Sequence, residues 1–212
     1  MGRRALKRIK ADIDISAHFK LPADLPTPWN PAALFGREAP LEIEVGSGKG
    51  LFLSAAAACQ PESDFLGIEI SHRYARYAAT RLAQRGLANA RLVHGDALEL
   101  FSRYVPTATL AAVHTYFPDP WWKARHKKRR VLNEVFLRDI ERVLRPGGAF
   151  HFWTDVEEYF RTTLALVAEV TGLVGPFAVS EKPAEHDLDY RTHFERRMRL
   201  HNEPVYRSEF VK

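Results

Sequence analysis

Residues 41–59, LEIEVGSGKGLFLSAAAAC, join a short apolar strand to a helix through a glycine-rich loop. The strand is predicted over 41–45, and the alanine-rich segment 51–59 has strong helix propensity. Glycines in the intervening loop let the backbone turn tightly and let a ligand approach, while the next helix presents its N-terminus. This strand–loop–helix unit predicts the beginning of an α/β domain.

The alternation continues along the chain. Further strands are predicted over 65–70, 90–96, 110–117 and 149–153, and helices over 71–85, 97–104, 131–145 and 155–171. Residues 192–200, THFERRMRL, alternate like a strand. Strands and helices in this order predict a parallel sheet covered by helices on both faces. Such sheets bind ligands at the carboxyl ends of their strands.

Length and composition indicate one globular domain. The 212 residues are enough for one sizeable core, and 46% hydrophobic with 27% charged residues is near the average for soluble proteins. Residues 1–29, basic and then proline-rich, are predicted to form a flexible extension, and residues 30–212 the single domain. A single cysteine, Cys59, and the lack of a long apolar stretch favour a reducing, cytoplasmic location away from membranes.

Positive charge is clustered. The net charge is +5, and residues 1–10, 123–130 and 191–199 together hold 15 of the 31 lysines and arginines. Any one of these clusters is explained equally well as a solvated surface. Three of them in one basic protein favour a polyanionic partner, a nucleic acid.

Acidic residues stand at the predicted strand ends. Glu44 precedes the GxGxG loop, Glu69 ends the second strand, and Asp96 follows the third. The third glycine is one residue early for a dinucleotide-binding fingerprint. Glu44 at the loop suits a cationic ligand such as S-adenosylmethionine (AdoMet), although a tight turn also explains the glycines. Glu69 is predicted to hold a ribose, and Asp96 either an adenine amine or the next helix as its N-cap.

The fourth strand is followed by YFPDPWWKARHKKRR, residues 116–130. Asp119 lies between two prolines, which restrict its neighbours. The tryptophans that follow can stack on bases, although at least one is expected in the core, and residues 123–130 can bind phosphates. Asp155, after the fifth strand, is predicted to cap a helix, with a second role at a substrate site left open. The nine histidines show no metal-ligand spacing, so no metal is predicted, and no obligate protein partner is evident.

Six segments occur in one order: EVGSGKG, GIEIS, GDALEL, YFPDPWWKARHKKRR, TDVEEYF and THFERR. Together they resemble the bacterial tRNA (guanine-46-N7)-methyltransferase family over about residues 40–200. The resemblance implies a Rossmann-like class I methyltransferase fold, with seven mostly parallel strands and one antiparallel strand near the C-terminus. It implies AdoMet as cofactor and tRNA as substrate. The implied cofactor residues are Glu44, Gly46, Gly48, Glu69, Asp96 and Asp119, with Asp119 at the reacting centre; the implied RNA-binding residues are Lys123, Asp155, Thr192, His193, Phe194 and Glu195.

Guanine N7 carries a free lone pair, so methylation needs no catalytic base. The absence of an obvious catalytic histidine or cysteine agrees with that chemistry. Three rival hypotheses stay open on the sequence: a non-catalytic RNA-binding protein, a nicotinamide-dependent oxidoreductase, and a methyltransferase that acts on another RNA or on a small molecule.

Overall fold

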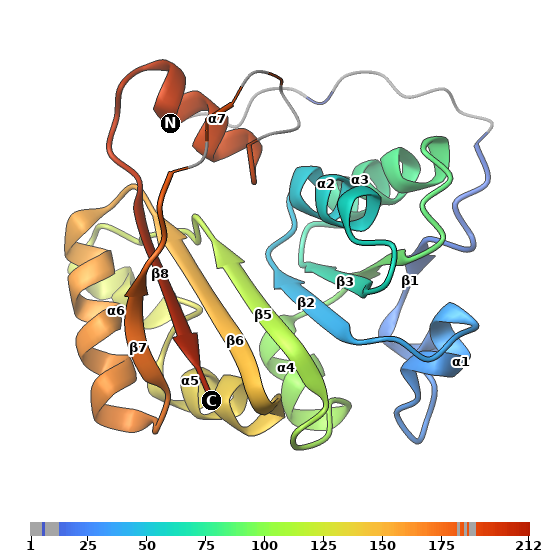
Figure 1. Cartoon of the computed structure of the whole chain (residues 1–212), viewed down its shortest axis with the longest axis horizontal. Helices are drawn as coiled ribbons and strands as arrows, with labels where there is room; N and C mark the ends of the chain where they lie inside the picture. The colour runs from blue at the N-terminus through green and yellow to red at the C-terminus, as the bar shows by residue number, and fades with distance from the viewer. Residues whose placement is uncertain (1–5, 7–12, 182, 185, 187–189) are drawn as a thin grey trace.

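The computed structural model describes residues 6, 13–181, 183–184, 186 and 190–212. Within these residues one sheet contains eight strands in the order β1-β4-β3-β2-β5-β6-β8-β7 (Figure 1). The strands are β1 (Phe19–Lys20), β2 (Leu41–Val45), β3 (Asp64–Glu69), β4 (Ala90–His94), β5 (Leu110–Tyr116), β6 (Leu144–Thr154), β7 (Val174–Ala178) and β8 (Tyr206–Val211). The α-helices are α1 (Pro31–Phe35), α2 (Leu51–Cys59), α3 (His72–Gln84), α4 (Ala97–Arg103), α5 (Glu134–Val143), α6 (Glu157–Val170) and α7 (His193–Leu200); the 3-10 helices are η1 (Pro22–Asp24) and η2 (Ala124–Arg129).

The chain order reverses across the sheet beside β2. From β2 the chain adds β3 and β4 on one side, then returns to add β5 and β6 on the other, all in parallel. The carboxyl ends of β2 and β5 therefore flank the topological switch point, where open α/β sheets bind their ligands. The predicted parallel α/β fold is confirmed.

Two layers of helices cover the sheet (Figure 1). On one face α2 and α3 bury small side chains such as Ala75, Ala78 and Ala79. On the other face α4, α5 and α6 bury large ones, with Phe101 and Phe136 in edge contact at 5.0 Å between ring centroids. Helix α7 lies outside both layers, beyond the carboxyl ends of the parallel strands.

The structure corrects the predicted strand number and one element. The prediction of seven strands was one short, because two-residue β1 pairs with β4 from within a proline-rich segment that shows no strand pattern. Residues 192–200 form helix α7, not a strand, because Thr192 caps the helix by accepting a hydrogen bond from the Glu195 N–H at 3.0 Å. The predicted antiparallel strand is β8, which pairs with β6 and β7.

Two helix boundaries also differ from the prediction. Helix α5 begins at Glu134, three residues later than expected, because Asn133 accepts from the Phe136 N–H and caps it. Asp155 does not cap α6 as predicted. That helix begins at Glu157, its N-cap is Val156, and the Val156 N–H donates to the hydroxyl of Thr154 instead. Asp155 is therefore available for another role.

Part of the predicted N-terminal extension packs on the domain. Phe19 and Lys20 form β1, and Leu25 is buried in the core beside α4. The basic cluster at 1–10 lies outside the described residues, apart from residue 6. The division at residue 30 stays a prediction.

Gly67, in the middle of β3, sets how closely the glycine loop packs. A Cβ atom there would lie 2.4 Å from both the Ser47 hydroxyl and a methyl of Leu53, and 2.6 Å from a methyl of Leu92. Residue 67 therefore has to be a glycine, without a Cβ atom, if the loop after β2 and the first turn of α2 are to contact β3.

We predict that Gly67→Ala lowers the free energy of unfolding by about 1–3 kcal/mol, because overpacking forces these neighbours apart. Urea denaturation measures the change. Gly172→Ala is the matched control, since its Cβ would meet only the flexible carboxylate of Glu141 at 3.1 Å. A change in Gly67→Ala no larger than in the control would contradict the packing argument.

Candidate functional site

The glycine loop after β2 is anchored on the tip of β3. The N–H groups of Gly46 and Ser47 both donate to the carbonyl of Ile68, at 2.8 and 3.1 Å. Glu69 accepts from the Gly48 N–H through one carboxylate oxygen and from the Ser71 N–H through the other, both at 2.8 Å. Gly46 and Gly48 have φ of 79° and 53°, which other residues rarely adopt. Glu69 thus joins the two strand-tip loops.

Glu44 is buried beneath this loop. Its residue is 3% exposed, and its Oε2 has no hydrogen-bond partner. Burial raises the pKa of the carboxyl to about 8; hydrogen bonding to Ser47 opposes the shift and the charge of Glu69 adds to it. A buried, unsatisfied acceptor is costly. It is the feature expected of a side chain that receives a cationic or hydrogen-bond-donating ligand group.

The third predicted acid lies at the next strand tip. Asp96 caps α4 by accepting from the Leu98 N–H at 2.9 Å, so its predicted capping role is confirmed. Its exposed carboxylate lies one strand away from Glu69, because Glu69 pairs with His94 at the ends of β3 and β4. Ile70, directly after Glu69, exposes 71% of its surface and provides an apolar contact at this edge.

Asp119 is held differently from the other acids. It is exposed in the loop after β5, and both Phe117 and Trp121 adopt left-handed backbone conformations, with φ of 51° and 47°. Burial raises the pKa of the Tyr159 phenol to about 12, and the charge of Asp119 adds to the shift, so Asp119 lies near α6. Contacts thus bring Glu44 and Glu69 to one loop, whereas Asp119 reaches the same edge of the sheet from β5.

The tryptophans and the basic run follow Asp119. Trp122 is 69% exposed, while Trp121 packs within the loop, edge-on to His126 and 5.1 Å from the guanidinium of Arg129. Neither belongs to the two core clusters. Lys123 is exposed, whereas Arg130 is buried. Within the run predicted to bind phosphates, Lys123 thus lies at the surface and Arg130 inside the protein.

The predicted segment 192–195 begins helix α7. Thr192 caps it, and the Glu195 carboxylate is buried, accepting from the Arg191 N–H at 2.7 Å and pairing with Arg207 at 3.1 Å. His193 lies 2.9 Å from the guanidinium of Arg81 on α3. The ring of Phe194 lies 4.9 Å from that of Phe117, which brings α7 to the tip of β5. Burial raises the pKa of half-buried Asp155 after β6, and the positive charge of Arg197 on α7 opposes part of this shift.

Arg191 was not predicted. Its guanidinium lies 5.6 Å from the ring centroids of both Phe52, at the beginning of α2, and Trp153, near the end of β6. It therefore connects α7 to the helix that follows the glycine loop. The only signal in the sequence was its membership of the basic cluster 191–199.

A buried polar network lies beneath these aromatics. His114 of β5 contacts the Tyr116 hydroxyl at 2.9 Å and a Glu42 oxygen at 2.7 Å. Burial lowers the His114 pKa well below its ordinary value, so the ring is neutral, and a proton on Nε2 satisfies both contacts. In the pair with Glu42, the neutral histidine thus donates a hydrogen bond from Nε2 to the carboxylate. The network supports β2 and β5 where they flank the switch point.

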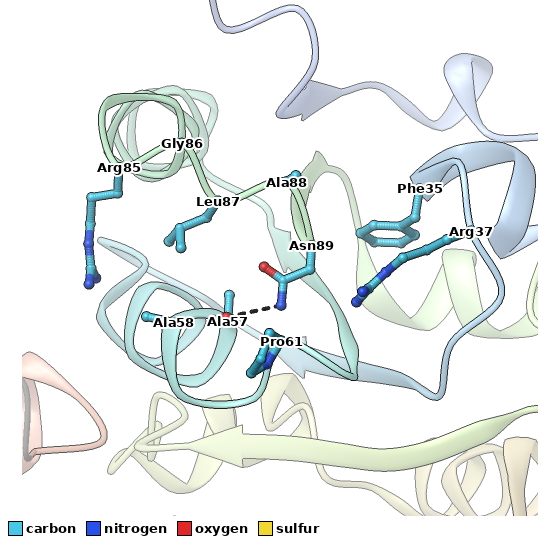
Figure 2. A pocket seen from close by; sticks show the side chains of 10 residues that line it. All are labelled: Phe35, Arg37, Ala57, Ala58, Pro61, Arg85, Gly86, Leu87, Ala88 and Asn89. Atoms are coloured by element: carbon cyan, nitrogen blue, oxygen red, sulfur yellow. Dashed lines mark hydrogen bonds between the residues drawn. The ribbon is translucent and has the colours of Figure 1, made fainter.

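A cavity of about 520 Å³ lies at the amino ends of the strands, opposite these acids. Its polar side chains bind to the segments around it, and Figure 2 shows the Asn89 amide bonded to the backbone of Ala57 on α2. The Asn89 amide donates to the carbonyls of Ala57 and Ser63, both at 3.0 Å, and Arg37 pairs with Asp64 at 2.8 Å. We therefore assign this cavity to packing, because the candidate site is at the carboxyl ends.

The described residues contain neither a membrane-spanning helix nor a metal site. None of the described helices is both long and apolar enough to cross a membrane. The same residues contain no group of three or more histidine, cysteine or acidic side chains arranged to hold a metal ion.

Comparisons agree with this geometry. The family model described as "Putative methyltransferase" matches residues 38–208. The tRNA (guanine-N(7)-)-methyltransferase of Rhodopirellula baltica is 47% identical, over 100% of this chain and 80% of that protein. The enzyme of that name from Hydrogenovibrio crunogenus is 42% identical, over 77% of this chain and 68% of that protein.

Solved structures share the fold at low identity. An O-methyltransferase from Thermotoga maritima, described as SAM-dependent, superposes with a TM-score of 0.56 and 16% identity, over 86% of this chain and 63% of that chain. A 30S ribosomal A1408 methyltransferase from an uncultured bacterium gives 0.53 and 15%, over 86% and 92%. The family match over residues 38–208 identifies the chain as a methyltransferase, and the shared fold agrees with it. The chain belongs to the tRNA (guanine-N(7)-)-methyltransferase family.

We predict that Glu44 makes stability pH-dependent. The native pKa is raised to about 8 from an ordinary 4.5, so the native state binds the proton more tightly than the unfolded state. The contribution of Glu44 to the free energy of unfolding therefore falls as pH rises from about 4.5 to 8, at up to about 1.4 kcal/mol per pH unit, and levels off above.

Urea denaturation of wild type and Glu44→Gln across this pH range isolates the contribution, because the glutamine does not titrate. Exposed Glu62→Gln serves as control and should follow wild type. A difference between wild type and Glu44→Gln that stays constant from pH 5 to 8 would show that Glu44 titrates normally.

Proposed function

We propose that this chain transfers the methyl group of AdoMet to N7 of a guanine in tRNA, at position 46 of the variable loop, in the cytoplasm. The observation that carries the proposal is the 47% identity over the full chain to a protein named for this activity on tRNA. The choice of position 46 rests on the family resemblance of the six segments, from EVGSGKG to THFERR.

The residues at the strand tips fit AdoMet. The unpartnered Oε2 of Glu44 is suited to the ammonium group of the ligand, since a nearby cation stabilises the ionised carboxylate. Glu69 still has acceptor capacity for the ribose hydroxyls beyond its two backbone contacts. Asp96 is proposed to accept from the adenine amine, with Ile70 against the ring. AdoMet, when bound, supplies a methyl group activated by the sulfonium.

The chemistry asks little of the protein beyond alignment and electrostatics. Guanine N7 attacks with its own lone pair, so no side chain has to remove a proton. The base gains positive charge as the methyl is transferred. We propose that Asp119 accepts hydrogen bonds from the N1–H and amino edge of the guanine and stabilises that charge. Prolines on both sides restrict the backbone that presents it.

The substrate side of the site is basic and partly aromatic. Exposed Trp122 and Lys123 are available for stacking on a base and for a phosphate contact. Asp155 and the segment Thr192–Glu195 are proposed to contact the RNA. Thr192 and Glu195 also hold the start of α7, so their substitution is expected to affect α7 as well as RNA binding.

The proposal is tested by incubating the protein with labelled AdoMet and unmodified tRNA, then mapping the modified base. Transfer to N7 of guanine 46 is expected. Calorimetry with AdoMet and with NAD separates the rivals: an RNA-binding protein binds neither, and an oxidoreductase binds NAD. Methylation at another base, or of another RNA only, would overturn the proposed specificity.

We predict that Asp119→Ala lowers kcat about 10²–10³-fold while AdoMet and tRNA binding persist, because a group that stabilises developing charge is removed. Single-turnover transfer of tritiated methyl to tRNA measures the rate, and calorimetry measures binding. Glu134→Ala on the outer face of α5 is the control and should match wild type, since Glu134 is exposed and pairs with Arg138 on its own helix. Near-normal transfer by Asp119→Ala would refute the role.

A further inference from the structure

We infer that Arg130 is a positioning residue for Asp119, acting as a clamp on the backbone of the catalytic loop and not as a phosphate contact. The inference rests on the proposed function, because it concerns how Asp119 is presented to the reacting base. It separates Arg130 from the basic run to which it belongs in the sequence.

The segment from Phe117 to Trp121 needs external support. Both of its end residues are bulky, and both have a positive φ, a conformation that costs free energy for any residue with a Cβ. Such conformations persist only where surrounding contacts fix them. At the first end the Phe117 N–H donates to the Trp153 carbonyl at 2.8 Å, which extends the pairing of β5 with β6.

Arg130 supplies the contact at the other end. Its Nε donates to the carbonyl of Pro120, the residue after Asp119, at 2.8 Å. The same guanidinium pairs with Glu158 of α6 through Nη2 at 2.7 Å and stacks 4.3 Å from the ring centroid of Tyr159. Only 10% of its side chain is exposed. The loop that carries Asp119 is thereby tied to the helix that follows β6.

These three contacts need the planar guanidinium group of an arginine. One guanidinium reaches a carbonyl and a carboxylate in different directions while its face lies on an aromatic ring; an ammonium group cannot make all three contacts. The contacts with the Glu158 carboxylate and with the face of the Tyr159 ring also offset the positive charge of Arg130, which leaves little of it for a phosphate. By contrast, the neighbouring Arg129 is exposed, with its guanidinium 5.1 Å from the ring centroid of Trp121.

These neighbours make a matched pair of variants, Arg130→Lys and Arg129→Gln. For Arg130→Lys we expect kcat to fall about 10–100-fold, because small displacements of a catalytic group are costly, with KM for tRNA and its salt dependence close to wild type. For Arg129→Gln we expect the reverse: KM rises, the slope of log KM against log salt falls by about 1, and kcat changes little.

Two further measurements complete the test. Urea denaturation and AdoMet calorimetry establish that Arg130→Lys is folded and binds cofactor. If it is not folded, Glu158→Ala replaces it, since Glu158 is a partly exposed residue of α6 and its loss removes the ion pair that ties the same guanidinium to α6. The double variant Arg130→Lys/Glu158→Ala should lower kcat less than the product of the two single effects, because both remove one clamp.

The outcomes are distinct. A raised KM and a reduced salt slope in Arg130→Lys, as in Arg129→Gln, would show that Arg130 binds phosphate and would overturn the inference. An unchanged kcat in both Arg130→Lys and Glu158→Ala would also overturn it. A failure of the proposed function would instead appear in the wild-type protein, as a lack of methyl transfer to tRNA.

Discussion

The carboxylate of Glu69 makes the two hydrogen bonds that hold together the strand-tip loops after β2 and β3, the half of the site that we propose to bind the cofactor. It accepts from Gly48 in the loop after β2 and from Ser71 in the loop after β3, at 2.8 Å each, so it fixes two strand tips with one side chain. Gly67, two residues earlier on β3, lets the loop approach closely enough for these bonds to form. This structural role of Glu69 is compatible with the ribose binding that we propose for it, since a carboxylate has about four acceptor positions.

This anchored loop explains how the fold tolerates Glu44. A carboxyl that is 3% exposed, with one oxygen unpartnered, opposes stability unless it holds a proton or meets a ligand. The buried carboxyl thus lowers the stability of the free protein, and a ligand that partners it would recover this free energy on binding. Such an arrangement is typical of functional sites. A cationic cofactor would offset the cost of burying this carboxyl, because it would favour the ionised form.

The sequence predicted best what is local and periodic. Segment 51–59 became α2 without adjustment, and Glu44 and Glu69 lie where strand-end reasoning put them. The alternation of polar and apolar residues over 192–200 wrongly predicted a strand. The segment is helical because Thr192 caps the helix and Glu195 is buried at its start. The two-residue strand β1 has no pattern to find, because its pairing with β4 is set by tertiary contacts. Arg130 looks like its basic neighbours in the sequence; only the approach of α6 distinguishes it.

The two halves of the site are held by different means, and this difference suits the chemistry. The proposed cofactor half is held by backbone hydrogen bonds and by the Glu69 carboxylate, which together link adjacent strand tips. The Asp119 half is a strained loop fixed at Phe117 by β6 and at Pro120 by Arg130, with Phe194 of α7 against its first residue. Methyl transfer requires nitrogen, methyl and sulfur in one line. If AdoMet lies in the first half and Asp119 orients the base, as we propose, Asp119 has to be fixed as firmly as the methyl donor. The contact between Arg130 and Pro120 meets this need, because it ties the exposed loop to α6.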